Sequence, residues 1–170
     1  MLRLLSSCLL AMLPFAFPAV AQQQIPEKQI ALPASDDLVV GHQARDGRTV
    51  LVELVPKGET VENYTRMVTL QTAPGMGSIP EEAFLDEFAK RYAAACPNTN
   101  VTQVPFGEAG LSGLRIDCPT HPATGKTETV FVRAIDMDED LGLVHITMRY
   151  FPMPEDGQWA RNYLGQVAVR

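Results

Sequence analysis

Most of the chain consists of short apolar or alternating runs, each closed by glycine, proline or aspartate. Runs of this length predict β-strands, and the short connections between them predict antiparallel pairing. The predicted strands are residues 38–45, 48–56, 64–72, 101–106, 112–118, 127–135 and 143–151. Two segments with an apolar period of three to four residues predict helices, one after the third strand and one near the C-terminus. The order βββαββββα predicts an α+β domain, in which an antiparallel sheet of about six or seven strands carries two packed helices.

The first two predicted strands form a hairpin around Asp46-Gly47, because residues of this type tolerate the positive φ angles of a two-residue turn. With this dipeptide at the tip, Gln43 lies opposite Val50. The face that carries this pair is the more apolar one, so we expect it to point to the core.

Local signals mark the ends of the two predicted helices. Ser78 followed three residues later by Glu81 predicts a capping box at the start of the first helix, and Pro97 ends that helix. Pro154 marks the start of the closing helix, and Trp159 lies on its apolar stripe.

Residues 1–21 have the pattern of a cleavable secretory signal peptide. Arg3 gives a positive start, residues 4–17 are almost wholly apolar, and residues 19–21 (Ala-Val-Ala) give the small-residue cleavage pattern. The apolar run is shorter than the roughly 20 residues of a spanning helix, which favours a signal over an anchor. A lipidated Cys8 is the weaker alternative, since most of the apolar run follows it. We therefore expect a periplasmic or secreted protein without a membrane span in its mature chain.

Residues 22–35 are polar and contain two prolines, which predicts an N-terminal tether ahead of a single domain over residues 36–170. The formal charge is −6, and the chain contains no basic cluster. An acidic chain of this kind is a poor candidate for binding nucleic acid, so we expect none.

Cys96 and Cys118 are the two cysteines that remain after the leader is removed. An even pair in an oxidising compartment predicts a disulfide. Cys96 lies on the apolar stripe of the first helix, and Cys118 is in phase with Leu114 and Ile116, so both should face the core. Their spacing is longer than that of a Cys-x-x-Cys redox motif, which favours a structural role.

Two segments resemble small secreted bacterial proteins of unknown function: residues 58–69 (GETVENYTRMVT) and residues 111–119 (LSGLRIDCP). The order of the predicted elements resembles the α+β sandwich of the photosystem II oxygen-evolving extrinsic subunit family and its non-photosynthetic relatives. The resemblance to the secreted proteins implies no known activity, and no functional residue is carried over from either one.

Catalytic and nucleotide-binding motifs are incomplete in this chain. Residues 125–127 (Gly-Lys-Thr) lack the first glycine of a phosphate-binding loop. Residues 110–113 (Gly-Leu-Ser-Gly) lack the second glycine of a serine nucleophile elbow. A hydrolase would need Ser112, His145 and Asp117 to converge, an alternative that the sequence leaves open.

The acidic run 136–140 offers carboxylates of the kind that bind calcium. The calcium-loop pattern requires glycine at position 141 and glutamate at position 147, where the chain has Leu141 and Thr147. A solvated acidic turn is therefore favoured, and we expect neither a resident metal nor a cofactor.

Basic residues on the predicted strands form the remaining constellation: Arg66, Arg115, Arg133 and Arg149, with His145 beside them. Arg115 and Arg149 are each out of phase with the apolar residues of their strands, so we expect them to emerge on one sheet face. Grouped arginines can bind a carboxylate or a phosphate. The competing and favoured interpretation is pairing with carboxylates of neighbouring strands: Glu53, Asp117 and Glu128.

These observations favour an exported, non-enzymatic domain that binds an unknown protein or a small anionic ligand. An accessory subunit of a larger complex differs from it only in partner. An envelope hydrolase with an unrecognised site is the alternative.

Overall fold

The computed structural model describes residues 28–170. The predicted signal peptide and the first residues of the predicted tether lie outside the described residues. The described elements are β1 (Ile30–Ala31), β2 (Leu38–Asp46), β3 (Thr49–Pro56), β4 (Arg66–Ala73), α1 (Glu81–Ala95), β5 (Asn100–Phe106), β6 (Leu111–Cys118), β7 (Glu128–Met137), β8 (Asp140–Met148), α2 (Pro154–Gln166) and β9 (Ala168–Val169).

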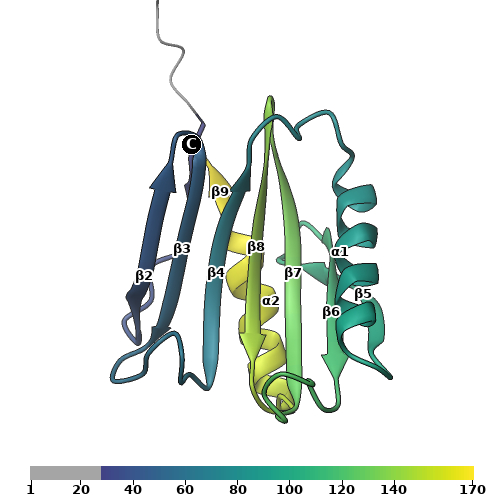
Figure 1. Cartoon of the computed structure of the whole chain (residues 1–170). Coiled ribbons are helices and arrows are strands. Elements are labelled where there is room, and N and C mark those ends of the chain that lie inside the picture. Colours follow the sequence, from purple (N-terminus) through teal and green to yellow (C-terminus); the bar gives the residue numbers. More distant parts are fainter. Residues whose placement is uncertain (1–27) are drawn as a thin grey trace, which may run out of the picture.

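Seven strands form one antiparallel sheet in the order β2-β3-β4-β8-β7-β6-β5. The meander β2–β4 leads into α1, which carries the chain to the opposite edge, and a second meander returns until β8 pairs with β4 (Figure 1). The predicted α+β class, the seven-stranded antiparallel sheet and the two helices are confirmed. Periodicity did not predict β1 and β9, which pair with each other, because two-residue strands are too short to show a period.

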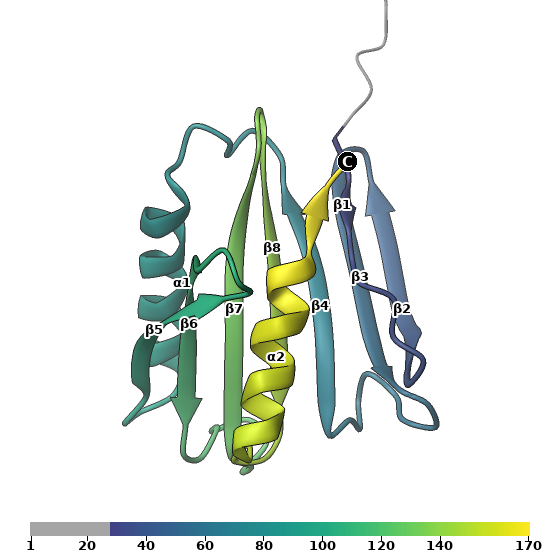
Figure 2. The same ribbon diagram turned by 180° about the vertical axis from the view of Figure 1, so that it is seen from behind.

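The two helices pack on opposite faces of the sheet, which we name the α1 face and the α2 face (Figures 1 and 2). On the α1 face, Leu85 of α1 joins a core with Leu114 and Val132 of the strands. On the α2 face, Leu164 of α2 joins a larger core with Ile146. Within the described chain, α1 lies over the β6–β7 side of its face, and no helix lies in front of β2, β3 and β4 there (Figure 1).

The first hairpin is present, but its predicted register is wrong. Asp46 pairs with Thr49, so the two-residue loop is Gly47-Arg48, and Gln43 lies opposite Val52. Gly47 has φ 57° at the first loop position, which is typical of a type II′ turn. Asp-Gly thus correctly predicted a turn at this place. Because the loop lies one residue further along the chain, the partners of residues 42–46 are shifted by two residues. A bulge between residues 40 and 42 reduces the shift to one residue for the rest of the ladder.

The helix starts are predicted correctly for α2 but not for α1. The N-cap of α1 is Pro80, without a side-chain capping bond, so the capping box expected from Ser78 is absent. The helix ends as predicted, with Cys96 as its C-cap and Pro97 beyond it. At α2 the prediction of a helix that starts near Pro154 is confirmed, since the helix begins at that residue.

The described part of the predicted tether is attached to the domain. Ile30 pairs with Val169, and the backbone of Gln29 exchanges two hydrogen bonds of 2.9 Å with that of Arg170. The Tyr163 hydroxyl donates a hydrogen bond of 3.2 Å to the carbonyl oxygen of residue 33. The domain therefore includes residues before position 36, where the sequence placed its start.

Candidate functional site

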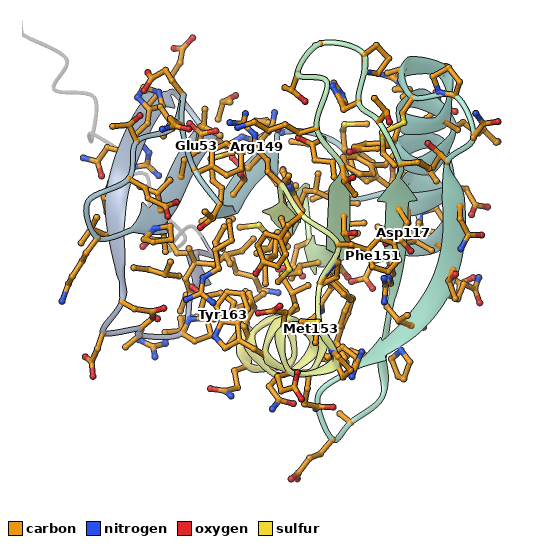
Figure 3. The ribbon with its side chains drawn as sticks, turned by 90° about the horizontal axis from the view of Figure 1, so that it is seen from below. Glu53, Asp117, Arg149, Phe151, Met153 and Tyr163 are labelled. Atoms are coloured by element: carbon orange, nitrogen blue, oxygen red, sulfur yellow. A yellow bond between two sulfur atoms is a disulfide. The ribbon has the colours of Figure 1, made fainter. Side chains whose placement is uncertain are left out.

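The predicted arginine cluster is divided between the two faces of the sheet, so its placement on one face is wrong. Arg66, Arg115 and Arg133 are in register with α2-face residues of the neighbouring strands, whereas His145 lies on the α1 face. Arg149 is also on the α1 side, and Phe151, which follows it closely, lies on the α2 side (Figure 3). The reason is that β7 and β8 bury apolar residues on both faces, so an out-of-phase residue of one strand can share a face with the apolar residues of another.

Two α2-face arginines have partners within the fold. Arg115 donates from Nε and Nη2 to the Asp117 carboxylate at 2.9 to 3.1 Å. Arg66 pairs with Asp37 and lies 4.3 Å from the centre of the Trp159 ring. These contacts satisfy both guanidinium groups without a ligand, and the Arg115 contact supports the carboxylate-pairing interpretation for Asp117.

Arg133 stabilises the end of α2. Its Nη1 donates hydrogen bonds of 3.0 Å to the Leu164 carbonyl oxygen and 3.1 Å to the Val167 carbonyl oxygen. The last carbonyls of a helix lack partners within the helix, and a cation at that end also favours the helix dipole. Burial lowers the pKa of Arg133 from its ordinary value. The contacts of Arg133 are therefore those of a structural residue.

The serine, histidine and aspartate considered for hydrolysis do not converge. Asp117 accepts a hydrogen bond of 2.7 Å from Thr129 and binds Arg115 on the α2 face, whereas His145 lies on the α1 face. Ser112 lines a pocket of about 220 Å³ near the start of α1, and that pocket has no histidine among its lining residues. This geometry does not form a Ser-His-Asp triad.

The acidic run before β8 forms the turn of the β7–β8 hairpin. Lys28 pairs with Asp138 at 2.6 Å, and Arg48 pairs with Glu139 at 2.9 Å and with Asp140 at 3.3 Å. Within residues 28–170, no group of three or more histidine, cysteine, aspartate or glutamate side chains is arranged to hold a metal ion. The carboxylates of this turn are used in ion pairs that attach it to other parts of the domain.

A polar cluster gathers on the α1 side, where α1, two loops and the ends of β7 and β8 meet. We name it the Glu128 cluster: Tyr64, Tyr92, His121, Glu128 and Arg149. The Tyr92 hydroxyl donates a hydrogen bond of 2.6 Å to Glu128 Oε2. Arg149 Nε lies 3.9 Å from Glu128 Oε1, and His121 Nε2 lies 3.9 Å from Glu128 Oε2. Glu128 thus acts as the common partner of three side chains, and its predicted pairing with an arginine is present.

The disulfide explains how segments distant in sequence come together here. Cys96 and Cys118 form the predicted bond, with their Cα atoms 6.1 Å apart. Cys96 follows Tyr92 by one helical turn, and Cys118 is the register partner of Glu128. The bond therefore holds the end of α1 above the start of β7. A disulfide is also compatible with an oxidising, extracellular compartment.

Arg149 is held tightly within the cluster. Its guanidinium carbon lies 3.7 Å from the centre of the Tyr64 ring, a cation–π contact, and its Nη1 donates 2.9 Å to the Glu62 carbonyl oxygen. The side chain is 15% exposed, and its Nε is buried without a hydrogen-bond partner among the described residues. The guanidinium is therefore fixed in orientation, and its Nε–H remains without a hydrogen-bond acceptor among the described residues.

The protonation states in the cluster follow from its burial. Burial, helped by the hydrogen bond to Glu128, raises the pKa of Tyr92, and burial also raises the pKa of Tyr64. Both phenols are therefore neutral at physiological pH. His121 Nδ1 accepts a hydrogen bond of 3.3 Å from the backbone N–H of residue 123, and its Nε2 lies 3.9 Å from Glu128 Oε2. Both ring nitrogens of His121 are thus directed at groups of the protein.

Beside Arg149 lies a solvent-open pocket of about 230 Å³, which we name the Arg149 pocket. Its lining residues come from the loop after β3, the loop before β7 and the end of β8: Glu59, Asn63, Tyr64, Thr65, Lys126 and Arg149. The Glu59 carboxylate accepts hydrogen bonds of 2.6 Å from the Thr65 N–H and 2.8 Å from its hydroxyl. The β3–β4 loop is therefore braced at the edge of this pocket.

Sequence reasoning identified Arg149 but missed the other lining residues of the pocket. Lys126 appeared only in an incomplete phosphate-loop motif, and Glu59 only in a segment of family resemblance, whereas Tyr64 was placed at the start of a predicted strand. A lysine that follows a glycine in a loop near a predicted disulfide is a weak signal of a binding site. The sequence does not show which other loop lies across from it in the fold.

His145 adds a pH-dependent group to the α1 face. Its half-buried ring lies 6.0 Å from the ring of Phe88, and burial lowers its pKa from 6.5 to about 4. The unfolded chain takes up a proton near pH 6.5 and the folded chain only near pH 4, so the unfolded state is favoured as the pH falls. The stabilisation that depends on neutral His145 is therefore fully present above about pH 6.5 and is lost as the pH falls toward about 4.

We expect this group to lower the free energy of unfolding by about 2 kcal/mol between about pH 8 and about pH 5. Urea denaturation at the two pH values measures the change. His145→Gln should lose most of this dependence, whereas His42→Gln, at an exposed position of β2, should keep it. Equal pH dependence in the wild type and in His145→Gln would contradict the expectation.

Neither helix in residues 28–170 is long and apolar enough to cross a bilayer. The resemblance to small secreted bacterial proteins stays a prediction that rests on the two segments given above. A scan of the sequence against protein-family models found no matching family, and a search of curated proteins found no matching relative.

Proposed function

We propose that this protein is an exported binding domain that takes a small charged ligand in the Arg149 pocket. The observation that carries the proposal is the pocket itself. Two cationic side chains, Lys126 and Arg149, border it together with the Glu59 carboxylate, the side-chain amide of Asn63, and the residues Tyr64 and Thr65. Convergent polar groups of this kind fix the orientation of a small ligand and give a site its specificity.

The state of the neighbouring acid and base groups supports binding over catalysis. His121 has its two ring nitrogens directed at a backbone N–H and at Glu128. Glu128 accepts from Tyr92, whose raised pKa makes it a poor proton donor to a substrate. A general base must reach the proton that it removes, and these groups face each other rather than the pocket.

Export is supported by the disulfide and by the predicted signal peptide. Cytosolic thiols are kept reduced, so a disulfide that joins two buried positions fits a protein of the periplasm or the extracellular medium. The ligand is then a small molecule of the envelope or of the surroundings.

Backbone NMR spectra recorded during titration with acetate, methylammonium and glycine test the proposal. Saturable shifts should appear at the amides of Asn63, Thr65 and Lys126 for at least one of these probes. Lys126→Gln should weaken acetate or glycine binding about fivefold, the size expected for one partly exposed ion pair. Lys90→Gln, on the exposed side of α1, is the matched control and should bind like the wild type.

If none of the three probes produces saturable shifts at the pocket, the proposal is wrong. Hydrolysis of simple esters that depends on Ser112 or Glu128 would instead support the alternative of an envelope hydrolase.

A further inference from the structure

We propose that the Arg149 pocket selects a small zwitterion, a ligand that carries an ammonium group and a carboxylate a few bonds apart, as a free amino acid does. This inference rests on the proposed binding function and names its ligand class. It follows from how charges are distributed around the pocket, and it goes beyond the small anionic ligand that arginines alone suggest.

Besides Arg149, the pocket is bordered by one cation, Lys126, and one anion, Glu59, which form no ion pair with each other. Lys126 forms no ion pair with any side chain of residues 28–170, although it lines the pocket. Glu59 also lines the pocket, and its carboxylate accepts hydrogen bonds from Thr65 rather than forming an ion pair within the described residues. The two charges come from different loops that meet at the border of the pocket.

Arg149 does not shift this balance toward anions. Its charge lies close to the Glu128 carboxylate, at 3.9 Å, and its guanidinium is spread over the Tyr64 ring. The fixed charge that a ligand meets is therefore close to zero, one positive at Lys126 and one negative at Glu59. A plain anion gains from Lys126 but is repelled by Glu59, and a plain cation meets the reverse. A ligand with both charges gains from each side.

The remaining lining residues suit a small ligand of this kind. Asn63 supplies a neutral side-chain amide, and Tyr64 and Thr65 complete the lining. The volume of about 230 Å³ is below the roughly 300–1,000 Å³ of pockets for drug-sized ligands. The pocket thus matches a compact molecule with two charged ends.

NMR or calorimetric titration of the purified protein with glycine, β-alanine, acetate and methylammonium tests the inference. Glycine or β-alanine should bind at least about tenfold more tightly than either acetate or methylammonium, since each of those loses one ion pair and keeps one repulsion. Comparison of glycine with β-alanine reports the separation of the two charges that fits best.

Two charge-neutralising variants should change the preference in opposite ways. Glu59→Gln should weaken zwitterion binding about fivefold and strengthen acetate binding, while its amide oxygen can still accept from Thr65. Lys126→Gln should weaken zwitterion binding and strengthen methylammonium binding. Glu108→Gln and Lys90→Gln, both exposed outside the pocket, are the matched controls and should leave all four affinities unchanged.

The outcomes separate the two proposals. Acetate binding as tight as glycine binding, with no gain in Glu59→Gln, would overturn the zwitterion inference and leave the binding function standing. The absence of saturable shifts for all four probes would overturn both.

Discussion

Replacing Cys96 and Cys118 together by serine is expected to lower the free energy of unfolding by about 3 kcal/mol. The bond closes a loop with a sequence separation of 22 residues, and the chain-entropy model assigns a stabilisation of this order to such a loop. Both sulfur positions are fully buried, so two serine hydroxyls would also lie in an apolar environment. This is a large share of the roughly 5–15 kcal/mol that stabilises a typical domain.

Urea denaturation of the wild type, the double serine variant and the wild type with a reducing agent measures the effect. The reduced wild type should approach the double variant, because both lose the same constraint on the unfolded chain. Titration of the unfolded, unreduced protein should find neither Cys96 nor Cys118 as a free thiol. An unchanged denaturation midpoint in the double variant would show that the fold does not depend on the bond.

Replacing Glu128 by leucine is also expected to cost about 3 kcal/mol. The change removes the carboxylate next to the Arg149 guanidinium, which is 15% exposed, and the acceptor of the Tyr92 hydroxyl. Removing one member of a buried ion pair costs roughly 3–5 kcal/mol, and the separation of 3.9 Å places this pair at the lower end. A buried donor left without a partner adds to the loss.

Glu128→Gln separates the charge from the hydrogen bond, because it keeps an acceptor for Tyr92 while it removes the negative charge. We expect it to destabilise the fold less than Glu128→Leu does. A double-mutant cycle of Glu128→Leu and Tyr92→Phe should show a coupling energy of about 1 kcal/mol. Glu82→Gln, at an exposed position of α1, is the matched control and should be nearly neutral. Wild-type stability of Glu128→Leu would show that the cluster does not support the fold.

Local pattern was enough to predict the elements of this fold. The alternation of the last long strand correctly placed Val144 and Ile146 on one face and His145 on the other. The disulfide could be predicted because Cys96 and Cys118 lie on the apolar phases of their elements, and both of these phases lie on the α1 face.

The grouping of residues on one face could not be predicted in the same way. A period of two tells that neighbours alternate, but it does not tell which face each set occupies when both faces are covered. Arg115 is out of phase with residues of the α1-face core, and Arg149 is out of phase with residues of the α2-face core, so the same local pattern places them on opposite sides. The hypothesis of one arginine face failed for this reason.

The Glu128 cluster could not be predicted from local sequence pattern for another reason. Tyr92, His121 and Glu128 come from a helix end, a loop and a strand start, and no spacing rule joins these three places. They meet because α1 carries the chain from β4 to the far edge of the sheet and the disulfide then fixes its last turn. The proximity of these residues can be inferred only when the order of the strands in the sheet is known.

The pairing of β1 with β9 determines how the molecule can be presented on a surface. Gln29 and Arg170 are joined by backbone hydrogen bonds, so both ends of the described chain leave the fold at one place. In Figure 1 this place is at the top, whereas the loop between β3 and β4 that borders the Arg149 pocket is at the bottom. An immobilising tag or a fused domain at the C-terminus would therefore leave the pocket facing away from the support and open to diffusing molecules.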